Sequence, residues 1–96
     1  MYQNGLGHVE NPSQAYKRMK ASAEQGYALA QHGIGFMYMQ GDCVDQNSKI
    51  SIEWFQKAAD QGLVGSMTTI AMMYENGDGV ERNPELAKEW YKKAGF

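Results

Sequence analysis

The sequence predicts an all-α protein, an α/α superhelix (solenoid) of about 2.5 helix-turn-helix repeats of 36 residues each. The first observation is a helical segment, 51–62, with looser copies on either side, so that 36 residues separate Gly26 from Gly62 and Trp54 from Trp90. The second is the return of Asn and paired Gly residues at one phase of this period, and the third is the helical spacing of apolar residues between them. A fixed period of this size indicates stacked units, because one helical pair cannot bury its apolar face alone.

One kind of helix, named B-type here, is predicted to begin after Asn11, Asn47 and Asn83, which share one phase of the repeat. Asn is a preferred N-cap because its side chain accepts a hydrogen bond from an unpaired backbone N–H of the first turn. The first two B-type helices are predicted to end at Gly26 and Gly62, because glycine readily adopts the left-handed conformation of a helix C-cap.

The other kind, named A-type, is predicted over 28–39 and 64–75. The two copies agree on one side of the helical wheel, for example at Ile34 and Ile70, and we expect this side to form the core. They differ on the opposite side, which could present one continuous variable surface. Its positions are Leu29, His32, Gly33, Phe36 and Gln40 in the first copy and Gly65, Thr68, Thr69, Met72 and Asn76 in the second.

The turns between A-type and B-type helices repeat as well. Gly41 and Cys43 stand in the first copy where Gly77 and Gly79 stand in the second. Paired glycines suit a tight connection with positive φ. Cys43 is therefore predicted to strain the backbone if its φ is positive.

The repeat register also divides the chain. Met1 falls in register with Met37 and Met73, so the chain reads as one incomplete unit followed by two fuller ones. We predict a single repeat domain over 1–96, composed of a partial unit at 1–27 and repeats at 28–63 and 64–96.

Composition excludes several classes of function. The net charge is −2, the pI is about 5.6 and only nine Lys and Arg are present, which argues against nucleic acid as a partner. No apolar run is long enough for membrane insertion, and the N-terminus lacks the layout of a signal peptide. Cys43, the single cysteine, allows no internal disulfide, which is compatible with the cytoplasm but predicts no compartment.

Catalytic and metal-binding interpretations are weak. Cys43 is predicted in a turn and His32 on the variable side, too far apart for a nucleophile and its base, and His8 is no better placed. The segment 77–79 lacks the third glycine and the preceding strand of a dinucleotide-binding fingerprint. Two pairs of turn acids could hold a cation only weakly, because Ca²⁺ takes six or more oxygens; they are Asp42 with Asp45 and Asp78 with Glu81. We predict no enzyme activity, no cofactor and no metal.

At the 36-residue phase the sequence resembles the Sel-one-like repeat family, which is related to the tetratricopeptide repeats. The matching residues are Ala30, Gln31, Ile34, Gly35, Met37, Tyr38, Gly41, Val44, Trp54, Phe55, Lys57, Ala58, Ala59, Gln61 and Gly62, then Ile70, Ala71, Tyr74, Gly77, Gly79, Val80, Ala87, Trp90, Tyr91, Lys93 and Ala94. The first unit departs from the pattern, with Arg18 and Met19 in place of the aromatic pair. The resemblance implies a concave surface, lined by the A-type helices, that binds proteins or peptides in adaptors, assembly scaffolds and many bacterial interaction proteins.

Two glycines give a further hint of function. Gly33 and Gly65 lie within A-type helices on the variable side, where each costs about 1 kcal/mol relative to Ala. Close approach of a partner's backbone would justify them, and drift at a tolerant exposed site is the alternative.

We therefore predict a non-catalytic interaction module or adaptor that binds a protein or peptide on its concave face, through the ten variable positions named above. One alternative is a structural module that self-associates into a homo-oligomer through the exposed ends of the solenoid. Another is a small bacterial inhibitor or immunity-type protein that blocks a toxin with the same concave face.

Overall fold

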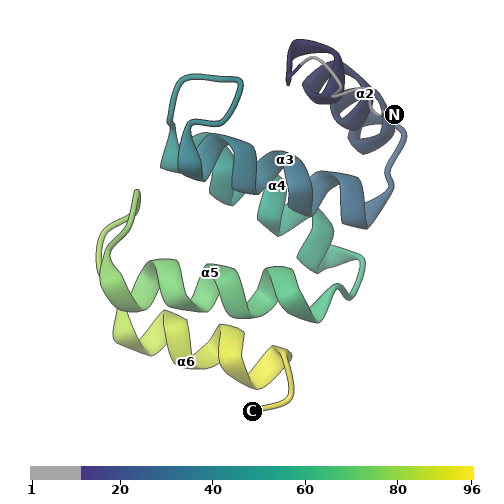
Figure 1. Cartoon of the computed structure of the whole chain (residues 1–96). Coiled ribbons are helices and arrows are strands. Elements are labelled where there is room, and N and C mark those ends of the chain that lie inside the picture. Colours follow the sequence, from purple (N-terminus) through teal and green to yellow (C-terminus); the bar gives the residue numbers. More distant parts are fainter. Residues whose placement is uncertain (1–11) are drawn as a thin grey trace, which may run out of the picture.

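The computed structural model describes residues 12–96, and within them it contains five helices and no strand (Figure 1). They are α2 (Pro12–Glu24), α3 (Ala28–Gln40), α4 (Ser48–Asp60), α5 (Val64–Asn76) and α6 (Pro84–Lys93). The predicted all-α class is confirmed, with α3 and α5 as the A-type helices and α2, α4 and α6 as the B-type helices. Met1, His8 and Asn11 lie outside the described residues.

The predicted ends of the B-type helices are found in the structure. The Asn47 side chain accepts a hydrogen bond from Ile50 N–H at 3.1 Å, and the Asn83 side chain accepts one from Leu86 N–H at 3.0 Å. Gly26 and Gly62 follow α2 and α4 with φ of 97° and 93°. The start and the end of a B-type helix are therefore each set by a local residue that can be identified in the sequence, an Asn N-cap and a C-terminal Gly.

The turns after the A-type helices have one geometry in both repeats. Gly41 and Gly77 cap α3 and α5 with φ of 72° and 70°. The second turn position also has positive φ, 74° at Gly79 and 70° at Cys43. Cys43 is thus a side-chain-bearing residue in the left-handed region, as its phase predicts, and this conformation costs about 1–2 kcal/mol.

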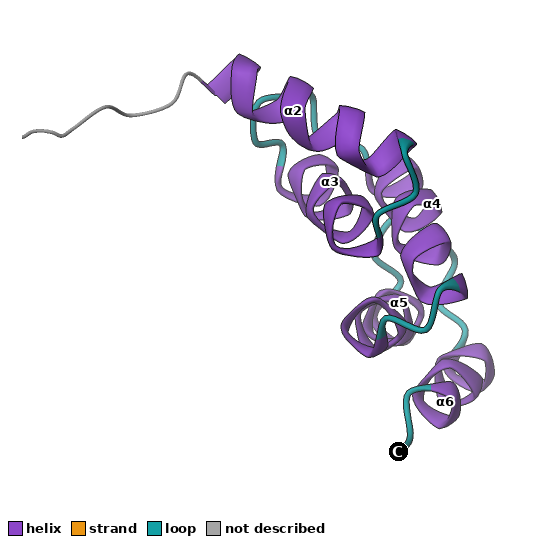
Figure 2. Cartoon of the chain, turned by 90° about the vertical axis from the view of Figure 1, so that its right-hand side faces the viewer, coloured by secondary structure: helices purple, strands orange, loops and turns teal. Residues whose placement is uncertain are grey.

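The helices stack in chain order, each packing on the next, from α2 to α6. Figure 2 shows α3 and α5 on one side of the array and α4 and α6 on the other. The buried apolar cluster lies between α4 and α5 and contains Ile52, Phe55, Ala59, Ile70 and Met73. The core is therefore a strip that continues from unit to unit, as expected of a solenoid.

Two glutamine side chains, the buried Gln31 and the exposed Gln61, join consecutive units through hydrogen bonds. Gln31 on α3 donates to the carbonyl oxygen of Ala23 at 3.1 Å, and its own side-chain oxygen accepts a hydrogen bond from Gln61 at 3.0 Å. Gln61 also donates to the Gly26 carbonyl at 2.7 Å. Because buried polar groups are costly when left unpaired, this network holds the end of α2, the start of α3 and the end of α4 in register.

Candidate functional site

A cavity of about 190 Å³ lies where the second halves of α3 and α5 meet the turn after α5. We call it the α3–α5 cavity. It is lined by Phe36, Met39, Thr69, Met72, Met73, Asn76 and Asp78. Four of these residues, Phe36, Thr69, Met72 and Asn76, belong to the ten positions that the sequence predicts as the binding surface. The cavity therefore joins part of the variable side of one A-type helix to part of the other.

The side chains of the cavity differ in exposure and chemistry. Met72 is 50% exposed, whereas Met73 is 2% exposed and belongs to the core. Phe36 and Met39 are partly buried and pack against the same core cluster. Asn76 and Asp78 are exposed and give the rim an amide and a carboxylate. An apolar floor with a polar rim is the arrangement that receives an apolar side chain of a partner.

Asp78 is a lining residue that the sequence names only as a turn acid, paired with Glu81, and not as part of the binding surface. It follows Gly77 in the turn, where an acidic residue predicts only a solvated loop. Its Oδ1 lies 3.4 Å from Ser48 Oγ, which donates to it from the start of α4. The repeat phase could have indicated Asp78. Gly77 ends α5 directly after Asn76, so the next residue, Asp78, lies close to the end of that helix.

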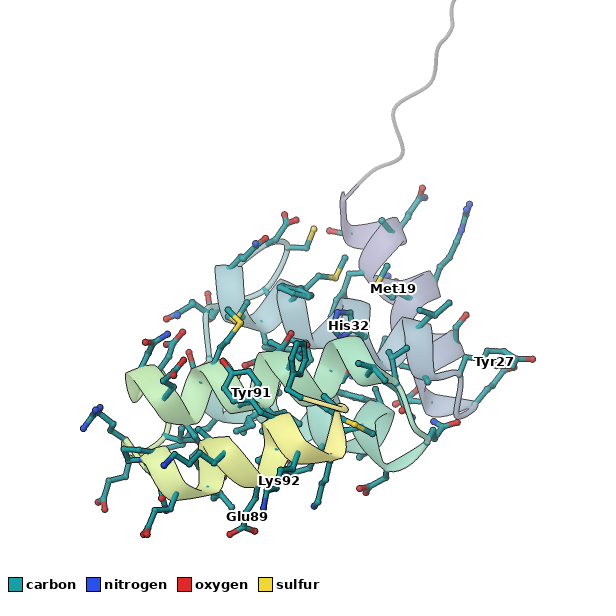
Figure 3. The ribbon with its side chains drawn as sticks, turned by 90° about the horizontal axis from the view of Figure 1, so that it is seen from below. Met19, Tyr27, His32, Glu89, Tyr91 and Lys92 are labelled. Atoms are coloured by element: carbon teal, nitrogen blue, oxygen red, sulfur yellow. The ribbon has the colours of Figure 1, made fainter. Side chains whose placement is uncertain are left out.

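His32 contacts two neighbouring helices from the variable side of α3 and is partly buried there. Its ring lies 4.8 Å from the Phe36 ring and 5.2 Å from the Phe55 ring, centroid to centroid, and its Nδ1 is 2.6 Å from Ser66 Oγ. Burial lowers the pKa of His32 below its usual 6.5. Figure 3 shows His32 near the middle of the view, whereas Tyr27 projects from the edge. His32 therefore links α3 to α4 and α5.

The two glycines of the variable side have neighbours within the molecule. A Cβ on Gly33 would lie 2.5 Å from Met19 Sδ, so α2 packs closely on α3 at this point. Gly33 is therefore only partly exposed on the variable side. Gly65 is exposed, and a Cβ there would lie 3.9 Å from His32 Cε1, an ordinary contact. Gly33 thus lies at a contact between helices, and a larger residue there requires the Met19 side chain to move.

The remaining predicted positions lie apart from the cavity or use their polar groups internally. Leu29 is 75% exposed and faces a different hollow, between α2 and α3. Gln40 is exposed at the last residue of α3. Thr68 and Thr69 donate their hydroxyl hydrogens to the Gly65 carbonyl at 3.0 and 2.8 Å. All ten positions are at least partly exposed, and the cavity brings together four of them.

The residues considered for catalysis are held in separate contacts. The Cys43 thiol is exposed and donates to Asp42 Oδ1 at 3.6 Å, and partial desolvation together with that carboxylate raises the pKa of the thiol. His32 pairs with Ser66 instead. A protonated thiol is a poor nucleophile, so this geometry does not activate Cys43. Across residues 12–96, no cluster of three or more His, Cys, Asp or Glu side chains is placed to hold a metal ion. None of the helices α2 to α6 is long and apolar enough to cross a bilayer.

Comparison with known proteins gives the family. The Sel1 repeat model matches three consecutive segments, residues 1–27, 28–63 and 66–95. The chain belongs to the Sel1 repeat family. A search of curated proteins found no significant match. Sel1 repeat proteins are generally protein-interaction modules and typically act as non-catalytic scaffolds.

Two crystal structures show how closely this Sel1 repeat chain follows known folds. A Sel1 repeat protein from Oxalobacter formigenes matches with a TM-score of 0.86 and 34% identity, over 90% of this chain and 66% of that one. A protective antigen present in uropathogenic Escherichia coli strains, which displays an SLR fold, matches with a TM-score of 0.85 and 37% identity, over 88% of this chain and 18% of that one. This chain therefore spans just under two thirds of the first protein and less than a fifth of the second.

Proposed function

We propose that this Sel1 repeat protein is a non-catalytic adaptor that binds a protein or peptide across the A-type helices, with the α3–α5 cavity as its anchor point. The observation that supports the proposal most is the cavity itself. It brings together Phe36 of α3 and Met72 of α5, 36 residues apart in sequence, on the side where the repeats differ.

The size of the cavity favours a side chain of a macromolecule over a free small molecule. Small-molecule sites usually enclose about 300–1,000 Å³. The α3–α5 cavity has about 190 Å³. A partner segment could insert one apolar side chain there, while the rest of the segment lies across α3 and α5.

The chemistry of the lining favours a partner with an apolar anchor and neighbouring donors. Met39 and Met72 have flexible, polarisable side chains that adapt to the shape of what they contact. Asp78 accepts hydrogen bonds, and Asn76 can both accept and donate. We therefore expect a segment with a Leu, Met or Phe beside a backbone N–H, Lys or Arg.

The test uses a partner obtained by affinity capture from the native source and a matched pair of variants. Met72→Glu places a charge in the cavity, and Val64→Glu places one at the start of the same helix. These positions are 50% and 49% exposed, so neither substitution buries a charge in the free protein. Met72→Glu should weaken binding about tenfold or more, because the complex would bury the carboxylate.

Val64→Glu should bind like the original protein, and circular dichroism should show the same helicity for both variants. Equal binding by Met72→Glu and the original chain would contradict the cavity as the anchor point. Gly33→Glu is unsuitable for this purpose because Gly33 packs on Met19.

A further inference from the structure

A second hollow, of about 430 Å³, lies between α2 and α3 at the other end of the array. We call it the open groove. It is lined by Ala15, Arg18, Met19, Ser22, Leu29 and Ala30. None of its side chains is classed as buried, and Leu29 is 75% exposed. Leu29 extends the apolar lining formed by Ala15, Met19 and Ala30 to the surface, and such a contiguous apolar patch suits contact with another molecule.

The repeat shows what this groove is shaped to hold. Moving each lining position forward by 36 residues gives Ser51, Trp54, Phe55, Ala58, Gly65 and Ser66. Four of these six, Ser51, Phe55, Ala58 and Ser66, are 0% exposed. We call this set the filled groove, because a helix covers it in the structure.

The helix in the filled groove is α3. Gly35 lies so close to Phe55 that a Cβ on it would be 2.7 Å from the ring, and the Phe36 ring lies 5.2 Å from the Phe55 ring. His32 adds the bond from Nδ1 to Ser66 Oγ at 2.6 Å. The open groove is therefore the surface on which one more A-type helix would lie, with three contact residues at spacings of three and four.

Within residues 12–96, both A-type helices already have packing partners, so neither can also occupy the open groove. α3 already packs on α2 and α4, and α5 on α4 and α6. Within residues 12–96, a second copy in the same fold therefore presents no unpaired A-type helix.

The open groove also differs in chemistry from the filled one. Ala30 stands where Ser66 accepts or donates the bond with His32, and Arg18 stands where Trp54 stands. Met19 replaces the rigid ring of Phe55 with a flexible thioether. An occupant would therefore need an apolar residue where α3 has His32, a small residue three positions later and an apolar residue after that.

We propose that the open groove binds an amphipathic helix of a partner protein, which takes the place that α3 takes in the filled groove. Recognition is by the helix-in-groove mode, in which apolar residues at spacings of three and four insert between two supporting helices. This second site is independent of the α3–α5 cavity, because the two hollows share no lining residue.

The probe is a fluorescein-labelled peptide with the sequence of residues 28–40 and the substitution His32→Leu, which suits Ala30 in place of Ser66. Fluorescence anisotropy should show saturable binding to the whole chain. Leu29→Glu should weaken it about tenfold or more, because docking would bury the new charge. Leu29 is exposed in the free protein, so this variant should fold normally. Ala15→Glu should have the same effect from the α2 side of the groove.

Met72→Glu, in the α3–α5 cavity, should bind the peptide as the original chain does. Loss of binding in Met72→Glu with retention in Leu29→Glu would overturn the proposal and place the peptide in the cavity. Absence of saturable binding would overturn it as well. A dimer of the chain that Leu29→Glu dissociates would assign the groove to a second copy and also overturn it.

Discussion

The filled groove and the open groove are built from residues 36 positions apart, yet one is the interior of the protein and the other is its surface. Phe55 is fully buried beneath α3, whereas Met19, at the same phase, borders a hollow. Equivalent helices form both grooves, but several lining side chains differ, and within residues 12–96 only the filled groove has a covering helix. In a stacked repeat, the same surface thus forms core where the preceding helix covers it, and on our proposal it docks a partner helix where residues 12–96 leave it uncovered.

The largest expected effect compares the two central residues of these grooves. Phe55→Ala removes a fully buried ring in contact with Phe36 and His32 and should lower the free energy of unfolding by about 3–5 kcal/mol. Met19→Ala should lower it by about 1 kcal/mol, because Met19 is only partly buried. Urea unfolding followed by circular dichroism measures both. Equal losses would show that the open groove is as tightly packed as the filled one.

The next effect compares the two turns that share a phase. A Cβ on Gly79 would lie 1.9 Å from Ser48 Cβ, at a φ of 74°. Gly79→Ala should therefore destabilise by about 2–4 kcal/mol, because the turn must move away from α4. Cys43→Gly should stabilise by up to about 1 kcal/mol, since relief of the left-handed strain exceeds the added entropy of the unfolded chain. A destabilised Cys43→Gly variant would show that the thiol makes contacts worth more than the strain.

A smaller contrast is expected for the two close glycines of α3. Gly35→Ala would press on the Phe55 ring, which is enclosed, and should destabilise by about 1–3 kcal/mol. Gly33→Ala meets only the end of the Met19 side chain, which can move into the open groove. Its net effect should be between zero and about 1 kcal/mol of stabilisation, because Ala favours the helix. Thermal unfolding measures both changes in stability. A larger destabilisation by Gly33→Ala than by Gly35→Ala would contradict this prediction.

The smallest effect concerns the protonation of His32. Because burial lowers its pKa in the folded protein, the unfolded chain takes up the proton first as the pH falls below about 6.5. The contribution of neutral His32 to the free energy of unfolding should therefore be fully present above that pH and decline below it. Urea midpoints at pH 7.5 and 5.5 should differ more for the original chain than for His32→Gln, which keeps a polar partner for Ser66. Parallel declines in the two proteins would assign the pH dependence to other groups.

Much of the fold is readable from the sequence because its determinants are local. Asn47 and Asn83 cap helices within one turn, Gly62 ends a helix by its own conformation, and the strain at Cys43 follows from its phase. These features need no knowledge of distant segments. The helix register follows from them, and the resemblance to a repeat family adds the stacking order.

The site is less predictable because a helical wheel gives the direction of a side chain and not what covers it. His32 and Gly33 point to the variable side, yet the sequence alone does not reveal that Ser66 and Met19 meet them there. Leu29 has a similar direction and lies in a different hollow from Phe36 and Met72. Distances between helices depend on the whole array, so the grouping of these residues emerges only in three dimensions.

The most direct test of the account is to map the captured partner on the isotope-labelled protein by amide chemical shifts. The account predicts that the largest shifts fall at Met39, Met72 and Asn76, around the α3–α5 cavity. The amide signals of residues on the exposed face of the B-type helices, such as Glu53 and Glu89, should not shift. Shifts that cluster on α4 and α6 and leave the cavity unchanged would contradict the account.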